Sequence, residues 1–264
     1  MSRRTSTFPV QRLGDGRALL NLGCSARIAS GWTNLDFSWL IRLGKHRRLC
    51  GQLHRMGLLS DLRFERILRL DPATIIWDLR RGIPFSDRTF DVVYHSHLLE
   101  HIDREDAPAF LRECLRVLKP RGIVRVVVPD LEVLAREYLG VVNNLPDRAT
   151  MAQHTFAVEQ MIDQMVIRTP RHRSLQHPAV RMVERLLIGS TDRAGILHRW
   201  MYDRFSAGHA LRDAGFDDVQ VMGAATSGVP GWREFDLDTE PSGEVYLPFS
   251  LYIEGRRPWE SDAG

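Results

Sequence analysis

Small, acidic and imidazole-bearing residues stand where four short apolar segments of the sequence end: Gly23-Cys24-Ser25, Asp36, Asp78 and His95-Ser96-His97. A glycine lets the backbone approach a ligand closely. One carboxylate has two acceptor oxygens, enough for both hydroxyls of a ribose, and a second acid can accept the exocyclic amine of an adenine. Because ligands of open α/β sheets bind at the carboxyl ends of the strands, this set predicts a nucleoside site.

A second group of titratable residues could transfer protons. His97, Glu100 and His101 follow the fourth apolar segment, and His198 lies in the segment His198-Arg199-Trp200-Met201-Tyr202-Asp203, which combines aromatic and titratable groups. The alternative interpretation is structural: Glu100 and His101 could stabilise the following helix, and His198 could belong to a packed hinge. No metal-ligand spacing is evident, so we expect no metal.

The elements that must position these residues are read from hydrophobic patterning. Apolar residues repeat at helical spacing between 104 and 118, with Asp103 as the expected N-cap, and a shorter helix is expected from Ser206 to Ala214. Short helices are expected within 38–70. Short apolar runs predict strands at 18–22, 32–36, 74–77, 91–94, 123–128, 216–222 and 250–254.

Strands that alternate with helices predict an α/β fold with a doubly wound, mostly parallel seven-stranded sheet. The last two strands have no clear helix between them, so an antiparallel edge hairpin is expected. Residues 131–200 look helical and are too many for a bare loop. We therefore expect a single domain over 1–264 with a helical insertion at 131–200 that forms an acceptor lid.

The number of glycines after the first strand restricts the kind of nucleoside that can bind. A dinucleotide fingerprint needs G-x-G-x-x-G at a helix N-terminus to cradle a pyrophosphate. The run from Gly23 to Ile28 lacks the second and third glycines. This argues against a nicotinamide-dependent oxidoreductase and favours a nucleoside with an amino acid tail.

Several motifs, in this order, resemble class I S-adenosylmethionine-dependent methyltransferases of the methyltransferase type 11 group. The resemblance implies a Rossmann-like fold with S-adenosylmethionine as the cofactor. Ser25 and Arg121 depart from it, because the family usually has glycine at both places. The motifs are Leu20-Asn21-Leu22-Gly23-Cys24, Gly31-Trp32-x-Asn34-Leu35-Asp36, Asp78-Leu79-x-x-Gly82-Ile83-Pro84-Phe85, Leu99-Glu100-His101, Arg116-Val117-Leu118-Lys119-Pro120 and Ala214-Gly215-Phe216.

The resemblance also implies roles for individual residues. Gly23 and its neighbours Asn21, Leu22, Cys24 and Ser25 would lie under the methionine tail. Asp36 would hold the ribose, Asp78 and Leu79 would border the adenine, and His95 and Ser96 would line the cofactor. An oxygen nucleophile benefits from a general base with a pKa near neutrality, so His97, His101 or His198, with Glu100, is the expected catalytic group.

Members with similar His-Ser-His and Leu-Glu-His patterns often accompany polysaccharide or glycolipid assembly, so the resemblance implies O-methylation of a saccharide. A small polar acceptor is the next expectation. The alternative function is a non-catalytic S-adenosylmethionine-binding or interaction module on a methyltransferase fold, because fold alone does not decide function.

Composition excludes several other classes. The net charge of +3 is too small to argue for nucleic acid binding. The three cysteines, Cys24, Cys50 and Cys114, form no CxxC pair, which fits a reducing cytosol. No apolar core follows Arg3 and Arg4 as in a signal peptide, and no apolar run approaches the roughly 20 residues that span a bilayer. We expect a cytoplasmic protein without stable membrane insertion; a homo-oligomer stays open.

Overall fold

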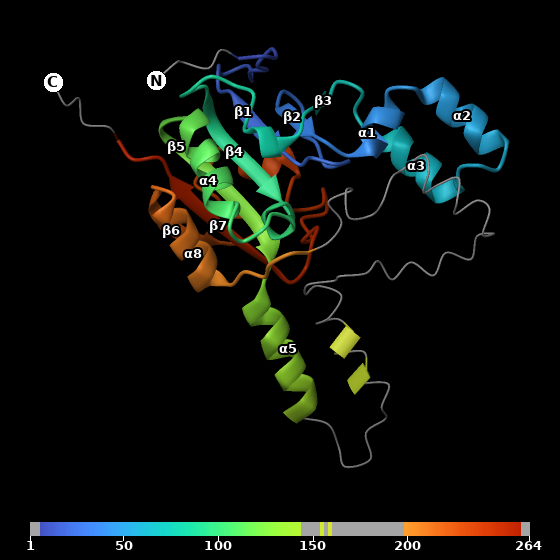
Figure 1. Cartoon of the computed structure of the whole chain (residues 1–264). Helices are drawn as coiled ribbons and strands as arrows, with labels where there is room; N and C mark the ends of the chain where they lie inside the picture. The colour runs from blue at the N-terminus through green and yellow to red at the C-terminus, as the bar shows by residue number, and fades with distance from the viewer. Residues whose placement is uncertain (1–5, 144–153, 156–157, 160–197, 260–264) are drawn as a thin grey trace.

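The computed structural model describes residues 6–143, 154–155, 158–159 and 198–259. Its centre is a seven-stranded sheet of order β3-β2-β1-β4-β5-β7-β6 (Figure 1). All neighbouring strands are parallel except β7, which is antiparallel to both β5 and β6. The strands are β1 (Leu19–Leu22), β2 (Thr33–Asp36), β3 (Ile75–Ile76), β4 (Phe90–Ser96), β5 (Leu118–Pro129), β6 (Asp217–Met222) and β7 (Ser250–Arg256).

This sheet confirms the predicted Rossmann-like, mostly parallel α/β fold. The expected antiparallel pairing of the last two strands is also present, with β7 inserted between β5 and the edge strand β6. Strand β1 lies between β2 and β4, so the chain reverses direction across the sheet there. The carboxyl ends of β1, β2 and β4 therefore meet at one edge, where ligands of such sheets bind.

The two faces of the sheet are covered differently. Helices α4 (Ala107–Val117) and α8 (Arg204–Asp213) pack on one face, with Phe110, Leu111 and Leu211 in its core. The other face is covered by the segment 223–247, which includes the 3-10 helix η4 (Trp232–Phe235). The Trp232 ring packs there against Trp32, which precedes β2, and Tyr94 of β4. Its centroid lies 6.2 Å and 5.3 Å from the centroids of those two rings.

Three helices lie beside the β3 edge of the sheet, as Figure 1 shows. Helices α1 (Trp39–Gly44), α2 (Arg47–Arg55) and α3 (Asp61–Arg69) confirm the short helices expected within 38–70. Ile41, Cys50 and Ile67 are buried together in a small core of their own. Because the sheet cores do not include these residues, the three helices form a satellite of the domain.

Two helix starts differ from the sequence prediction. Helix α4 begins at Ala107 with Asp106 as its N-cap, not Asp103, because residues 103–106 form a turn. Helix α8 begins at Arg204 rather than Ser206, because the Asp203 side chain accepts a hydrogen bond from the Ser206 N–H in a capping box. The expected stop at Gly215 is present, with φ of +102°.

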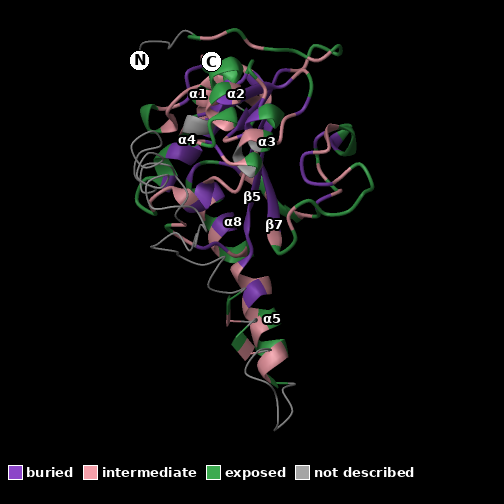
Figure 2. Cartoon of the chain, turned by 90° about the vertical axis from the view of Figure 1, so that its right-hand side faces the viewer, coloured by how far each residue is buried: buried purple, intermediate pink, exposed green. Residues whose placement is uncertain are grey.

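Helix α5 (Leu131–Asn143) follows β5 directly and extends away from the sheet (Figures 1 and 2). It forms the first part of the expected insertion at 131–200, in which residues 154–155 and 158–159 are also helical. The rest of the insertion lies outside the described residues, so the acceptor lid stays a prediction. Within the described ranges, no helix combines the length and the apolar composition that crossing a bilayer requires.

A buried guanidinium ties β5 to the segment that covers the second face. Arg125 is fully buried, and its Nε and Nη1 lie 2.7 Å from carboxylate oxygens of Asp238 and Glu254. Its remaining N–H groups donate to the carbonyl oxygens of Gly223, Ala224 and Thr226. All five donors of the side chain are thereby used.

The turn after β1 needs a residue without a side chain. Gly23 has a φ of +66°, a conformation that glycine adopts without steric cost. A Cβ placed on Gly23 would lie 3.1 Å from Leu98 Cδ1, closer than ordinary van der Waals contact. Leu98 comes from the segment after β4, so this turn brings the ends of β1 and β4 together.

The buried ion network predicts a large loss of stability on Arg125→Met. The substitution leaves two buried carboxylates without their partner, which costs about 3–5 kcal/mol of unfolding free energy. Urea unfolding monitored by circular dichroism measures this loss. Arg136→Met is the control, because the Arg136–Glu132 pair is exposed on α5 and its loss should cost no more than about 1 kcal/mol. Similar losses in both variants would contradict the prediction.

Gly23→Ala should destabilise the protein more than Gly57→Ala. Both glycines have similar left-handed φ angles, +66° and +70°, which cost an alanine about 1–2 kcal/mol. Only Gly23 faces Leu98, whereas a Cβ on Gly57 meets no atom within 4 Å. Urea unfolding of both variants, repeated in a Leu98→Ala background, measures the excess. The excess should disappear in that background; equal losses in the wild-type background would refute the Leu98 contact.

Candidate active site

The loop after β1 is bound to the end of β2. The N–H groups of Gly23 and Cys24 both donate to the Leu35 carbonyl, at 2.8 Å and 3.3 Å. The Ser25 N–H donates to Asp36 Oδ2 at 2.8 Å. Ser25 has a φ of +46°, so the serine holds a left-handed position that glycine occupies at lower cost. This explains why glycine is usual here in the family that the sequence resembles.

Asp36 ends β2 and keeps acceptor capacity. Its second oxygen, Oδ1, accepts from the Ser38 N–H at 2.5 Å, so each oxygen has one backbone donor. A carboxylate offers about four lone-pair sites, which leaves about two for further donors. Asp36 is only 7% exposed, so these donors would reach it in a shielded environment. Its chemistry therefore fits two ribose hydroxyls.

Asp78 follows β3 and is held by its neighbour. It caps the 3-10 helix η1 (Leu79–Arg81), and the Arg80 guanidinium grips both oxygens at 2.7–3.1 Å. These hydrogen bonds from Arg80 hold the pKa of Asp78 below its usual range, so the group is an acceptor at neutral pH. The Trp77 N–H donates to the Asp36 carbonyl, which places β2 and β3 ends side by side.

Phe37 is a candidate that the sequence reasoning missed. It follows Asp36 directly and is 38% exposed, and the guanidinium carbons of Arg42 and Arg80 lie 4.5 Å and 5.9 Å from the centroid of its ring. Arg80 also bonds to Asp78, so the Phe37 ring and the Asp78 carboxylate lie near the same guanidinium group. The signal in the sequence is an aromatic residue immediately after the acid that ends a strand.

Other predicted cofactor residues serve the sheet with their side chains. Asn21 Nδ2 donates to Asn34 Oδ1 and to the Arg27 carbonyl, and Leu22 lies in the core. Cys24 is buried, with its thiol 4.0 Å from Thr74 Oγ1, and burial raises its pKa. Only the backbone of these three residues remains to meet a ligand. Their predicted contact with the cofactor stays a prediction.

His95 points into the core instead of toward the sheet edge. Its ring is fully buried and meets Phe110 of α4 edge-on at 5.2 Å. Neither ring nitrogen has a hydrogen-bond partner among the described residues, and burial lowers the pKa of His95 to about 3. The side chain is therefore neutral. Ser96, the last residue of β4, is half-buried, and its role toward the cofactor also stays a prediction.

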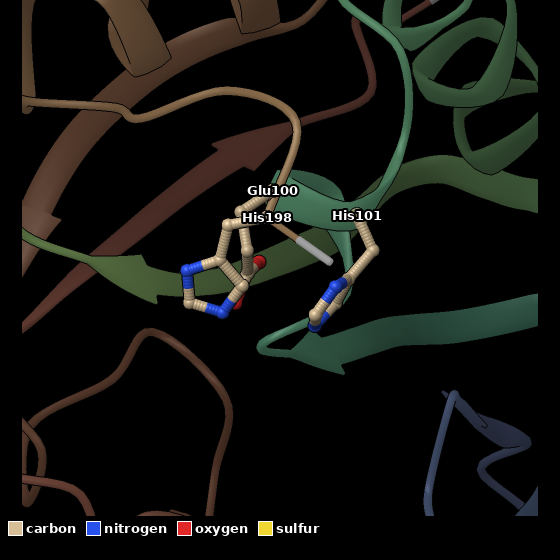
Figure 3. Close-up of side chains that lie close together, drawn as sticks. All are labelled: Glu100, His101 and His198. Carbon is tan, nitrogen blue, oxygen red and sulfur yellow. The ribbon is translucent and has the colours of Figure 1, made fainter. Parts of the chain in front are cut away.

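The four predicted catalytic side chains lie together after β4, although sequence spacing could not show this. Glu100 and His101 belong to the 3-10 helix η2 (Leu99–His101), and Figure 3 shows His198 facing both. Their nearest ligand-type atoms lie within 4.8 Å of one another, and the rings of His101 and His198 are 4.8 Å apart. His97 Nδ1 is 3.3 Å from Glu100 Oε1. We call these four residues the His/Glu cluster.

Burial sets the charge state within the His/Glu cluster. Glu100 is fully buried, and burial raises its pKa to about 8. Burial and the nearby His198 and His101 lower the pKa of His97 to about 4. His97 also lies in the left-handed region, with φ of +48°, and its Nε2 is 2.9 Å from Ser250 Oγ. Strained backbone of this kind gathers at functional sites, which supports a role for this loop.

Backbone hydrogen bonds bring His198 to the cluster. The N–H groups of Arg199 and Trp200 both donate to the Glu100 carbonyl, at 2.6 Å and 3.3 Å. The Arg199 guanidinium grips Asp103 at 2.7 Å and 3.0 Å, and Arg104 lies over the Trp200 ring at 4.4 Å. The segment 198–200 is thereby fixed along η2.

The nucleoside-type residues and the His/Glu cluster share one edge of the sheet. Gly23 follows β1, Asp36 ends β2, Asp78 comes after β3, and His97 follows β4. A ligand held by the first group would have its reactive end near the second, because β1 and β4 are neighbours. The arrangement can bind a nucleoside derivative and move a proton beside it.

Comparison with known proteins finds sequence similarity to methyltransferases in part of the chain. Residues 65–126 match the family model described as "Methyltransferase domain", of the methyltransferase type 11 group. A Mycolicibacterium smegmatis protein named "Probable S-adenosylmethionine-dependent methyltransferase" is 32% identical over 95 residues, which cover 31% of this chain and 36% of that protein. The alignment thus spans about a third of this curated relative.

Two solved structures extend over most of the chain. One comes from the complex between the Haloferax volcanii Trm112 methyltransferase activator and a methyltransferase. It is 15% identical in sequence, the match covers 96% of this chain and 86% of that chain, and the TM-score is 0.40. The other is a SAM-dependent methyltransferase of Methanosarcina mazei: 13% identity, 92% of each chain and a TM-score of 0.41. Structural similarity at these TM-scores carries no argument about the family of the chain. Both sequence matches are to S-adenosylmethionine-dependent methyltransferases over a part of the chain, so they support the predicted class I family and its cofactor, S-adenosylmethionine.

Proposed function

We propose that this chain methylates an oxygen atom of a saccharide or another small polar acceptor, with S-adenosylmethionine as the methyl donor. The observation that carries this proposal is the position of the His/Glu cluster, which shares a sheet edge with Asp36 and Gly23. The setting that we propose is cytoplasmic polysaccharide or glycolipid assembly. Residues 131–200 would cover the acceptor, and the oligomeric state is a separate question.

The residues at this edge would hold the cofactor as follows. The Gly23 turn would accommodate the methionine tail, because a Cβ is absent where the chain bends. Asp36 would accept the ribose hydroxyls on its remaining lone pairs. Asp78, with Leu79 and the ring of Phe37, would border the adenine. S-adenosylmethionine supplies a methyl group on a sulfonium, which leaves readily in an in-line displacement.

The His/Glu cluster would orient the acceptor and take its proton. His97 is engaged by Ser250 on one nitrogen and faces Glu100 with the other, so it acts as a positioning residue. His101 and His198 are half-buried and therefore reachable by an acceptor hydroxyl. One of these two imidazoles would accept the proton as the new bond from oxygen to carbon forms. Positioning of the reactants supplies much of the remaining rate.

Asp36→Ala should weaken cofactor binding strongly without unfolding the protein. Isothermal titration calorimetry with S-adenosylhomocysteine is expected to show one site in the wild-type chain and no response to NAD. Loss of hydrogen bonds to a charged acceptor, at about 1.5–3 kcal/mol each, should weaken binding at least about tenfold. Asp213→Ala, an exposed acid on α8, is the control and should bind normally. No binding by the wild-type chain would favour an interaction module.

His101→Ala or His198→Ala should lower kcat while leaving the S-adenosylhomocysteine Kd unchanged. Loss of a general base costs about 10²–10⁴-fold in rate. A screen of saccharide acceptors with methyl-labelled S-adenosylmethionine provides the assay, and His209→Ala on α8 serves as the matched surface control. Full activity in single alanine variants of all four residues of the His/Glu cluster would disprove the base. Cofactor binding without product on any acceptor would support the non-catalytic alternative.

A further inference from the structure

Three side chains of the His/Glu cluster form an arrangement that sequence spacing does not suggest. Glu100, His101 and His198 each direct a ligand-type atom toward the others, and these atoms lie within 4.8 Å of one another (Figure 3). Two imidazoles and one carboxylate are the protein ligands of a common class of catalytic zinc site, which keeps a fourth position open. Among the described residues, this is the one group of three such side chains close enough to hold an ion.

Glu100 provides an independent indication of a missing ligand. Its carboxyl group is fully buried, yet neither oxygen has a hydrogen-bond partner among the described residues. The approach of His97 Nδ1 at 3.3 Å does not have hydrogen-bond geometry. Buried polar groups are normally satisfied, because an unmet one costs about 1–3 kcal/mol. An ion bound between Glu100 and the two histidines would satisfy it.

We propose that Glu100, His101 and His198 bind a divalent transition-metal ion of the zinc class. Tetrahedral zinc with bonds of about 2.0–2.1 Å separates its ligand atoms by about 3.3 Å. The observed spread therefore needs the ligand atoms to close by about 1.5 Å or less. The nearby cations do not oppose the ion strongly, because Arg199 is paired with Asp103 and Arg104 lies over Trp200.

The geometry leaves one side of the site open. Glu100 is fully buried, whereas both histidines are half-buried, so the free coordination position faces away from the core. An acceptor oxygen at that position would be oriented by the ion, which also lowers the pKa of a coordinated hydroxyl. This role rests on the proposed methyl transfer, whereas the binding site itself rests on the three ligands alone. With the ion bound, His101 and His198 would be ligands, so the coordinated acceptor hydroxyl, with its lowered pKa, would release its proton to solvent instead of to a histidine.

The test begins with the metal content of full-length protein purified without chelator and without an affinity tag of histidines. Chelator-treated protein is then titrated with Zn²⁺ by calorimetry and with Co²⁺ by visible absorption, which reports coordination directly. We expect one ion per chain. Glu100→Gln and His198→Ala should each weaken binding by at least about tenfold, because even outer-sphere partners of metal ligands contribute about 10–100-fold.

Matched controls separate this site from surface binding and from misfolding. His209→Ala removes an exposed histidine that pairs with Asp213 on α8, and it should leave the titration unchanged. Metal-free Glu100→Gln and His198→Ala should keep the wild-type circular dichroism spectrum. No stoichiometric binding by the wild-type chain, or equal binding by both ligand variants, would overturn the proposal.

Titration of the same samples with S-adenosylhomocysteine distinguishes the two proposals. An ion bound in a chain that does not bind S-adenosylhomocysteine would support the metal site and remove its role in methyl transfer. Binding of S-adenosylhomocysteine without any ion would refute the metal site and leave the histidine base in place.

Discussion

The buried Arg125 guanidinium is the constraint on which the second face of the sheet depends. Its partners come from β7 and from the segment 223–239, so one side chain fixes a strand order and a covering segment together. Asp238 also accepts a hydrogen bond from Tyr94 of β4 at 2.6 Å. Because β4 leads directly into His97, the same network steadies the strand that presents the His/Glu cluster.

The sheet was predictable because its strands are short apolar runs whose pattern depends on local sequence. Six strands lie within two residues of their predicted bounds, and the antiparallel end was anticipated. Strand β5 begins five residues earlier than predicted, at Leu118. The structural role of Arg125 was not predicted, because the sequence 123–128 looks like an ordinary apolar strand with one charged residue. Its acidic partners lie 113 and 129 residues further along the chain, and only the folded structure shows that they meet.

The candidate site was predictable in composition but not in geometry. Asp36 and Asp78 were recognised from their positions at strand ends. Asp36 accepts one backbone N–H on each oxygen, whereas Arg80 occupies both oxygens of Asp78. The His/Glu cluster required more, because His198 reaches it through backbone hydrogen bonds that no side-chain pattern encodes. The side chains of Asn21, Leu22 and His95 are buried, because successive strand residues point to opposite faces and both faces of this sheet are covered. Ser25 and Arg121, the two departures from the family pattern, share one physical property: both have positive φ.

The backbone and the side chain of Glu100 have different roles. Its carbonyl oxygen accepts the N–H groups of Arg199 and Trp200, while its carboxyl group faces His97, His101 and His198. Every amino acid has this carbonyl group, so the attachment of the segment 198–200 does not depend on the side chain at position 100. A substitution at this position would therefore change the chemistry of the cluster while the backbone connection that holds His198 beside it is retained.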